Sequence, residues 1–168
     1  GANLTLNGAL TGTANSSLVA RGSGTLFLTA NNSGFAGPFK IDNTGGNTNV
    51  EIQHPNALGT NLVTVTTATQ LRLNIAGGGT IANNLDINGS GSGASPGALL
   101  NINGNTTWAG NIHMNAASAV NLMTFGVLGS STLTVTGQIS NAATSGYQVI
   151  KKGGGTLYLN PQFAAGNI

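Results

Sequence analysis

Apolar residues alternate with small polar residues in many short runs along this chain, and Gly or Asn separates most runs from the next. A period of two is the pattern of a half-buried β-strand, and no stretch sustains the spacing of a helix. The polar partners are mostly Thr, Asn and Ser, which suit a solvated strand face. The clearest runs are Leu4/Leu6, Leu26/Leu28, Phe39/Ile41, Val50/Ile52, Val63/Val65, Leu71/Leu73/Ile75, Leu85/Ile87, Leu100/Ile102, Ile112/Met114, Val120/Leu122, Leu133/Val135 and Leu157/Leu159.

Glycine-rich stretches mark several connections between these runs. They include residues 77–79, 89–93 and 153–155, where turns with positive φ are expected because glycine has no Cβ. The chain is therefore predicted to be all-β. A spacing of roughly 8–13 residues between runs fits a sandwich or a barrel as well as a solenoid, so spacing alone leaves the architecture open.

Two blocks near the start of the chain recur in the same order near its end. Residues 4–11 match residues 133–140 in their apolar and turn positions, an offset of 129. Residues 21–28 match residues 152–159, an offset of 131. A closed sandwich has no reason to begin its first strands again, whereas a solenoid stacks such units indefinitely.

The repeat predicts a single continuous β-solenoid segment over residues 1–168. It comprises one long unit of about 131 residues, approximately 21–151, and the start of the next, 152–168. An antiparallel β-sandwich with a duplicated first unit is the alternative fold. The first eight residues already read as a strand and its turn, so we expect the chain to be part of a larger polypeptide.

The second pair of blocks shares a motif, which is a basic residue followed by G-x-G-T-L-x-L. Its positions are Arg21, Gly22, Gly24, Thr25, Leu26 and Leu28 in the first copy and Lys152, Gly153, Gly155, Thr156, Leu157 and Leu159 in the second. Phe35–Gly37 and Phe163–Gly166 follow the two copies. With these residues the sequence resembles the autotransporter-associated β-strand repeat of bacterial surface proteins. The resemblance implies a right-handed parallel β-helix on a secreted or cell-surface protein.

Composition supports an ordered but weakly charged chain. Only 5% of the residues are charged, against about 25% in typical soluble domains. There are 27 glycines among the 168 residues, and 39% of the residues are hydrophobic. The regular placement of Leu, Ile and Val argues against a disordered low-complexity chain, because there is enough apolar surface to bury.

Charge, cysteine content and hydrophobic run length argue against nucleic-acid binding, cysteine chemistry and a membrane span. The basic residues Arg21, Lys40, Arg72, Lys151 and Lys152 are scattered apart from the last pair, whereas nucleic-acid binding needs a basic cluster. The chain has no cysteine, so it can form neither a disulfide nor a thiolate metal site. No apolar run approaches the roughly 18 residues of a membrane span.

The acidic residues offer little material for catalysis. Glycoside hydrolysis needs two carboxylates that face one another, and the chain contains only Asp42, Glu51 and Asp86. Asp42 and Glu51 could lie on neighbouring coils, but each reads as part of a solvated strand end. Three scattered carboxylates also cannot supply the ligands of a calcium-binding solenoid. We therefore expect no catalytic site, no metal and no cofactor.

Two histidines and the single tryptophan are the remaining candidates for a binding role. His54 precedes Pro55 in a turn, and His113 should point away from the face that Ile112 and Met114 bury, so both are predicted to be lone surface histidines. Trp108 could stack on a sugar, but we predict that it packs against the stack of coils or at a turn.

Taken together, these observations predict a structural segment of an extracellular bacterial fibre or surface protein. The expected partner is the chain itself, through stacking of coils end to end, and surface glycans are a further possible partner. An adhesin module that binds host or polysaccharide surfaces is the first alternative, and a carbohydrate-active enzyme is the second.

Overall fold

The computed structural model describes residues 1–92, 97–115, 122–141 and 148–160. This part of the chain contains β-strands and no helix, and all of its strand pairings are parallel. No helix that could cross a membrane is found in these residues. The prediction of a parallel β-solenoid is confirmed, and the antiparallel sandwich is wrong because its strands would pair in opposite directions.

Three parallel sheets form the sides of the solenoid. The seven-stranded sheet has the order β1 (Leu4–Leu6), β3 (Gly24–Leu28), β5 (Thr48–Ile52), β7 (Gln70–Asn74), β10 (Leu99–Asn103), β13 (Leu122–Val127) and β16 (Gln148–Lys152). The six-stranded sheet contains β2 (Leu18–Ala20), β4 (Phe39–Ile41), β6 (Val63–Val65), β9 (Leu85–Ile87), β12 (Ile112–Met114) and β15 (Ile139–Asn141). The four-stranded sheet contains β8 (Gly79–Ile81), β11 (Asn105–Trp108), β14 (Thr132–Val135) and β17 (Thr156–Leu159).

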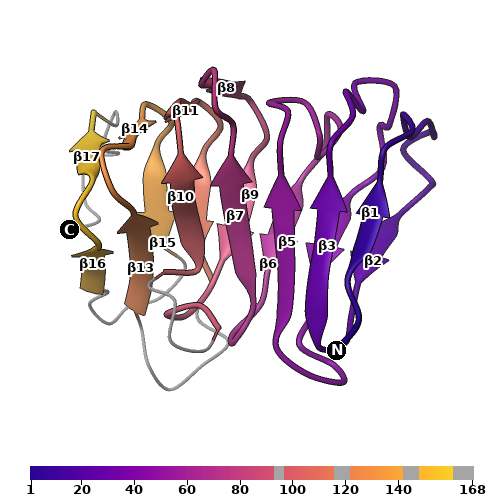
Figure 1. Cartoon of the computed structure of the whole chain (residues 1–168), viewed down its shortest axis with the longest axis horizontal. Coiled ribbons are helices and arrows are strands. Elements are labelled where there is room, and N and C mark those ends of the chain that lie inside the picture. The colour runs from indigo at the N-terminus through magenta and orange to yellow at the C-terminus, as the bar shows by residue number, and fades with distance from the viewer. Residues whose placement is uncertain (93–96, 116–121, 142–147, 161–168) are drawn as a thin grey trace.

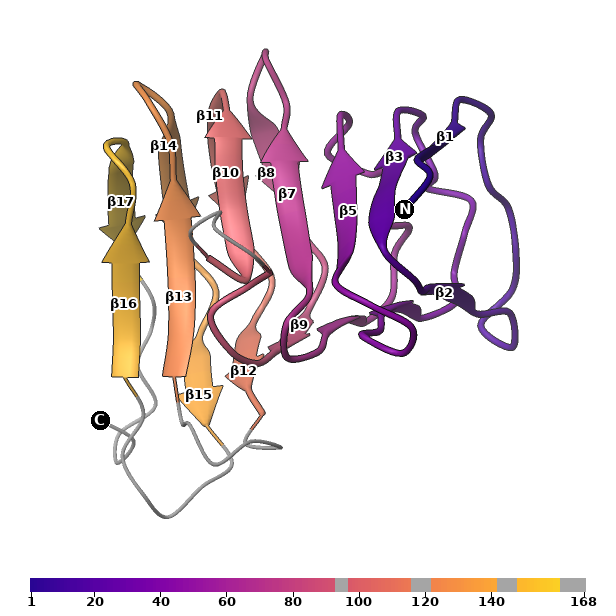
Figure 2. The same cartoon turned by 60° about the horizontal axis from the view of Figure 1, so that its bottom comes forward.

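Each turn of the solenoid, here called a coil, contributes one strand to each sheet that it reaches. The coils stack along the long axis of the molecule. Figure 1 shows the strands of the seven-stranded sheet side by side, from β1 near the N-terminus to β16 near the C-terminus. Figure 2 shows the six-stranded sheet below them. The first three coils contribute no strand to the four-stranded sheet. The first two of them are joined instead by an isolated bridge between Gly12 and Phe35.

Inward side chains from successive coils stack into columns that form one core. Phe39, Val63, Leu85 and Ile112 are paired in register on the six-stranded sheet and are fully or almost fully buried. Burying each such side chain contributes about 1.5–3 kcal/mol, which offsets the ordering of a glycine-rich backbone. Regular alternation therefore accounts for both the strands and the core.

The alternation is shifted by one residue in β10. Leu99, not Leu100, is paired with the inward Leu71, so Leu100 lies on the outer face, although it is only 2% exposed. Asn101 takes the next inward position and is completely buried, because its amide donates hydrogen bonds to the carbonyl oxygens of Gly104 and Thr132 at 3.0 and 2.9 Å. The predicted Leu100/Ile102 face was therefore wrong.

The inward residues of β13 also differ from those predicted. Met123 and Phe125 are buried in the core, whereas Leu122 is only half-buried, so the predicted inward position of Leu122 was wrong. Val120 lies outside the described residues.

Successive coils approach one another closely at two stacked glycines. A Cβ added to Gly110 would lie 1.9 Å from the carbonyl oxygen of Asn83, and a Cβ added to Gly137 would lie 1.9 Å from that of Gly110. Only glycine fits this approach, so these positions set the spacing of the coils at this corner. The expected turns are also present, since Gly78, Gly89 and Gly153 have positive φ.

Candidate functional site

Both copies of the repeated motif contain a glycine turn followed by a strand, but the two strands lie on different sheets. In the first copy, β3 stacks on β1 of the seven-stranded sheet and pairs Leu4 with Leu26. In the second copy, β17 stacks on β14 of the four-stranded sheet and pairs Leu133 with Leu157. The second copy thus lies five coils and one sheet further along the chain. Phe163–Gly166 lies outside the described residues.

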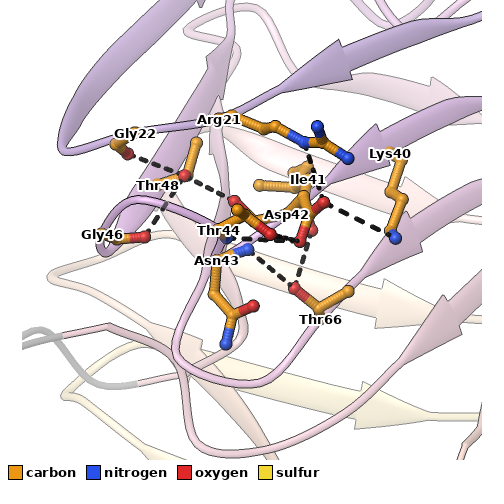
Figure 3. Close-up of polar contacts among 10 residues, drawn as sticks. All are labelled: Arg21, Gly22, Lys40, Ile41, Asp42, Asn43, Thr44, Gly46, Thr48 and Thr66. Carbon is orange, nitrogen blue, oxygen red and sulfur yellow. Dashed lines mark hydrogen bonds and ion pairs between the residues drawn. The ribbon is translucent and has the colours of Figure 1, made fainter.

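The basic position that opens the first copy belongs to a polar corner around the buried Asp42 (Figure 3). Arg21 Nε donates to Asp42 Oδ2 at 2.9 Å, and Lys40 Nζ lies 3.7 Å from the same oxygen. Thr44 donates to Asp42 Oδ1 through its backbone N and its Oγ1. Asp42 was predicted at a solvated strand end, but it is only 6% exposed, because two coils supply partners for its carboxylate.

The same contacts determine the charge state of Asp42. Burial acts to raise the pKa of this carboxyl, but the hydrogen bonds from Thr44 and Arg21 and the nearby charge of Lys40 hold the pKa below its ordinary value. Thr48 supports the corner, since its Oγ1 donates to the carbonyl oxygen of Asp42 at 2.7 Å and contacts that of Gly22 at 2.7 Å. The arrangement stabilises the turn that follows β4, and both carboxylate oxygens of Asp42 accept hydrogen bonds within it.

Glu51 lies on the seven-stranded sheet, in the coil after Asp42. Its Oε1 accepts hydrogen bonds from Asn74 Nδ2 at 2.7 Å and from Gln53 Nε2 at 3.3 Å. Arg72 is paired with Glu51 in register but donates to Gln70 Oε1 at 2.6 Å. Burial lowers the pKa of Arg72, and the charge of Glu51 partly opposes this shift. The predicted solvated strand end was again wrong, because Glu51 is buried in this network.

The structure brings together three residues that the sequence keeps apart. Asp86, His113 and Ser140 are paired in register on β9, β12 and β15, on the outer face of the six-stranded sheet. His113 Nδ1 lies 3.4 Å from Asp86 Oδ1. His113 points away from the core as predicted, but the prediction of a lone histidine was wrong, because strand pairing places Asp86 beside it.

His54 and Trp108 have structural surroundings. The half-buried His54 accepts a hydrogen bond at Nδ1 from the backbone N of Asn56 at 3.0 Å. Trp108 is fully buried between Ile81 and Val135 of the neighbouring coils, which confirms the predicted packing role. A buried ring cannot stack on a ligand, so Trp108 contributes no sugar-binding surface.

A groove of about 230 Å³ lies next to Asp86, at the C-terminal ends of β4, β6, β9 and β12. Its lining includes Thr64, Thr66, Asp86, Asn88 and Asn115. Sequence reasoning missed this groove, since its residues, which include Asn43 after β4, come from four coils and share no motif.

Within the described ranges, no three His, Cys, Asp or Glu side chains are grouped so that they could hold a metal ion. Comparison of the chain with protein-family models, with curated proteins and with solved structures finds no match.

Proposed function

We propose that this chain is a structural segment of an extracellular bacterial fibre or surface protein, which becomes elongated by stacking of coils end to end. One observation carries the proposal. In the part of the chain that the structure describes, the exposed large hydrophobic side chains all lie on the first and last strands of the stack. They are Leu4, Val19, Val149, Tyr158 and Leu159.

Three of these side chains continue the inward columns. Leu4 is paired with Leu26 on β3, Val149 with Met123, and Leu159 with Val135. Among the described strands, those that carry these side chains have a neighbour on one side only, so their other edges can accept a further strand. A further coil, from the same chain or from a second copy, would cover both the apolar side chains and the strand edges.

The two ends of the stack differ in their charge and shape. On β16, Lys151 is paired in register with the inward Phe125, and it is exposed. A cation at this position interrupts the apolar column, so docking at this end would rest mainly on Val149 and Leu159. The N-terminal end has a pocket of about 230 Å³ whose lining includes Leu4, Leu6 and Leu18.

The resemblance to autotransporter-associated repeats supports the finer part of the proposal, which is a right-handed coil on the surface of a bacterium. The scattered basic residues give no reason to propose a nucleic-acid partner.

We also propose that the segment has no catalytic activity. Asp42 directly follows β4 of the six-stranded sheet, whereas Glu51 lies on β5 of the seven-stranded sheet, and Asp42 accepts hydrogen bonds from Arg21 and Thr44. Asp86 shares the outer face of the six-stranded sheet with Asp42 but lies two coils away, about 10 Å along the axis at the usual strand spacing. Neither pair forms the facing carboxylates that glycoside hydrolysis requires.

The proposal is tested by imaging and by association. Negative-stain images of the intact native protein should show elongated particles, and compact globules alone would contradict the proposal. The 168-residue chain should associate as its concentration rises in sedimentation-velocity experiments. The Leu4→Lys variant should stay monomeric, whereas the control Thr107→Lys, on an outward position of β11, should associate like the wild type.

A binding module is the second candidate function. The outer face of the six-stranded sheet favours it, because Thr64, Asp86, His113 and Ser140 form a column of polar side chains in register. Saturable binding on a glycan array, lost when this face is mutated, would support this function. Turnover of a polysaccharide that disappears with Asp42, Glu51 or Asp86 would instead indicate an enzyme.

A further inference from the structure

The groove on the six-stranded sheet lies between two columns of polar side chains. Thr64 and Asp86 belong to the first column and are paired in register on β6 and β9. Thr66, Asn88 and Asn115 form the second column, each directly after its strand, and their backbone N atoms continue the ladder to the preceding coil. Because side chains alternate along a strand, residues 64 and 66 share one face, as do residues 86 and 88.

The chemistry of the lining is that of a site for hydroxyl groups. Threonine hydroxyls and asparagine amides both donate and accept hydrogen bonds, and a carboxylate accepts two or more. The described lining of the groove contains no Lys or Arg, and the nearby Lys40 lies 3.7 Å from Asp42. An anionic ligand would meet the charge of Asp86 without a cation to balance it. A neutral ligand that carries several hydroxyls matches these groups.

Asp86 is held so that part of its carboxylate remains available. Its neighbours Leu85 and Ile87 are fully buried, so the backbone that carries it is fixed by the core. His113 Nδ1 faces Oδ1 at 3.4 Å, which leaves Oδ2 as the oxygen that does not face the histidine. A carboxylate that accepts from two adjacent hydroxyls forms charge-assisted hydrogen bonds, which are about twice as strong as neutral ones.

The size of the groove limits the ligand. Its volume of about 230 Å³ is below the range of about 300–1,000 Å³ for drug-sized ligands. We propose that the groove binds one residue of a neutral saccharide, with Asp86 as the charged acceptor and Thr64, Asn88 and Asn115 as neutral partners. This inference rests on the second candidate function, the binding module, and is independent of end-to-end stacking.

The test is a titration of the 168-residue chain with a panel of methyl glycosides, namely glucoside, galactoside, mannoside and N-acetylglucosaminide, followed by NMR. At least one should give saturable shifts of the amides of β6, β9 and β12. Asp86→Asn should weaken that binding at least tenfold. The control Glu51→Gln removes a carboxylate on the seven-stranded sheet and should leave the affinity unchanged, and circular dichroism confirms that both variants are folded.

Several outcomes would overturn the inference. Tighter binding of free glucuronate than of any neutral glycoside would show an anion site. Loss of glycoside binding on addition of EDTA would show a cation site. Binding that persists in Asp86→Asn would exclude this groove, while saturable binding elsewhere on a glycan array would still support a binding module. If neither the panel nor the array gives saturable binding, both the inference and the binding module fail.

Discussion

Asn101 lies between Leu73 and Val127 in an otherwise aliphatic column of the core, and it is completely buried. Its amide nitrogen donates to the carbonyl oxygens of Gly104 and Thr132, and the second of these lies in the next coil. The side chain thus bonds two turns of the solenoid to each other from inside the core, at the place where the chain bends from the seven-stranded to the four-stranded sheet.

Replacing Asn101 by Leu should destabilise the protein by about 1–3 kcal/mol, even though the column becomes fully apolar, because two carbonyl oxygens lose their donor. Urea unfolding measures this loss. Asn103→Leu, on the exposed end of the same strand, is the control and should change the free energy of unfolding by less than about 0.5 kcal/mol. A stabilised Asn101→Leu variant would show that the hydrogen bonds contribute less than the burial of an amide costs.

Trp108→Ala should lower the free energy of unfolding by about 3–5 kcal/mol, since the indole is fully buried between two coils. Trp108→Phe should lose less, because most of the volume is kept and the indole N–H, which has no partner in the described structure, is removed. Tyr158→Ala is the matched control, as this aromatic side chain is 59% exposed on the same sheet. Equal losses for Trp108→Ala and Tyr158→Ala, measured by far-UV circular dichroism, would contradict the assigned packing.

Gly110→Ala should destabilise the protein by about 1–3 kcal/mol, because the new Cβ would overlap the carbonyl oxygen of Asn83. Gly8→Ala is the control, since a Cβ at Gly8 meets no atom within 4 Å. Thermal melts of the two variants should separate clearly. A Gly110→Ala variant as stable as the wild type would mean that the coils can move apart at this corner.

Asp42 should make stability depend on pH in the acid range. Its pKa in the folded protein is below the ordinary value of 3.8, so its contribution is complete above that value and is lost as pH falls through the folded pKa. In Asp42→Asn, the difference in urea midpoint between neutral and acid pH should therefore be smaller than in the wild type. Thr44→Ala, which removes one of the hydrogen bonds to Oδ1, should give an intermediate difference. Identical pH dependence in all three proteins would exclude this role.

The placement of the second motif copy can be measured by distances between spin labels, since the chain has no cysteine of its own. Phe27 and Lys152 are outward residues of one column on the seven-stranded sheet, five coils apart, so labels there should be separated by about 24 Å along the axis. Labels at Phe27 and Tyr158 should be further apart, because Tyr158 lies on another sheet. The opposite order of distances would place both copies on the same sheet.

Alternation in the sequence was enough to predict most strands but not every face. The runs Leu26/Leu28 and Val63/Val65 are strands with the predicted residues inward or buried. In β10 two leucines are adjacent, so hydrophobicity does not choose between Leu99 and Leu100, and the choice follows from the hydrogen bonds of Asn101. Several short strands were not among the predicted runs, including β2 and β8. The inward residues of β2 are Leu18 and the small Ala20, separated by the apolar Val19, and those of β8 are Gly79 and Ile81, so neither strand shows a clear alternation of large apolar and polar residues.

The polar sites could not be predicted, because the length of a coil varies. In the seven-stranded sheet, Val50 and Leu71 are paired across 21 positions, whereas Leu71 and Leu99 are paired across 28. No fixed period would therefore place Asp86 next to His113. Loop lengths that differ from coil to coil determine which outward residues meet.

The shift of the repeated motif by one sheet per copy has a consequence for any longer array. A third copy at the same offset would fall on the six-stranded sheet, and a fourth would return to the seven-stranded sheet. The motif would then trace a screw around the axis, with the outward aromatic residue, Phe27 or Tyr158 here, facing three directions in turn. A fibre built in this way would present these aromatic side chains on all three of its sides.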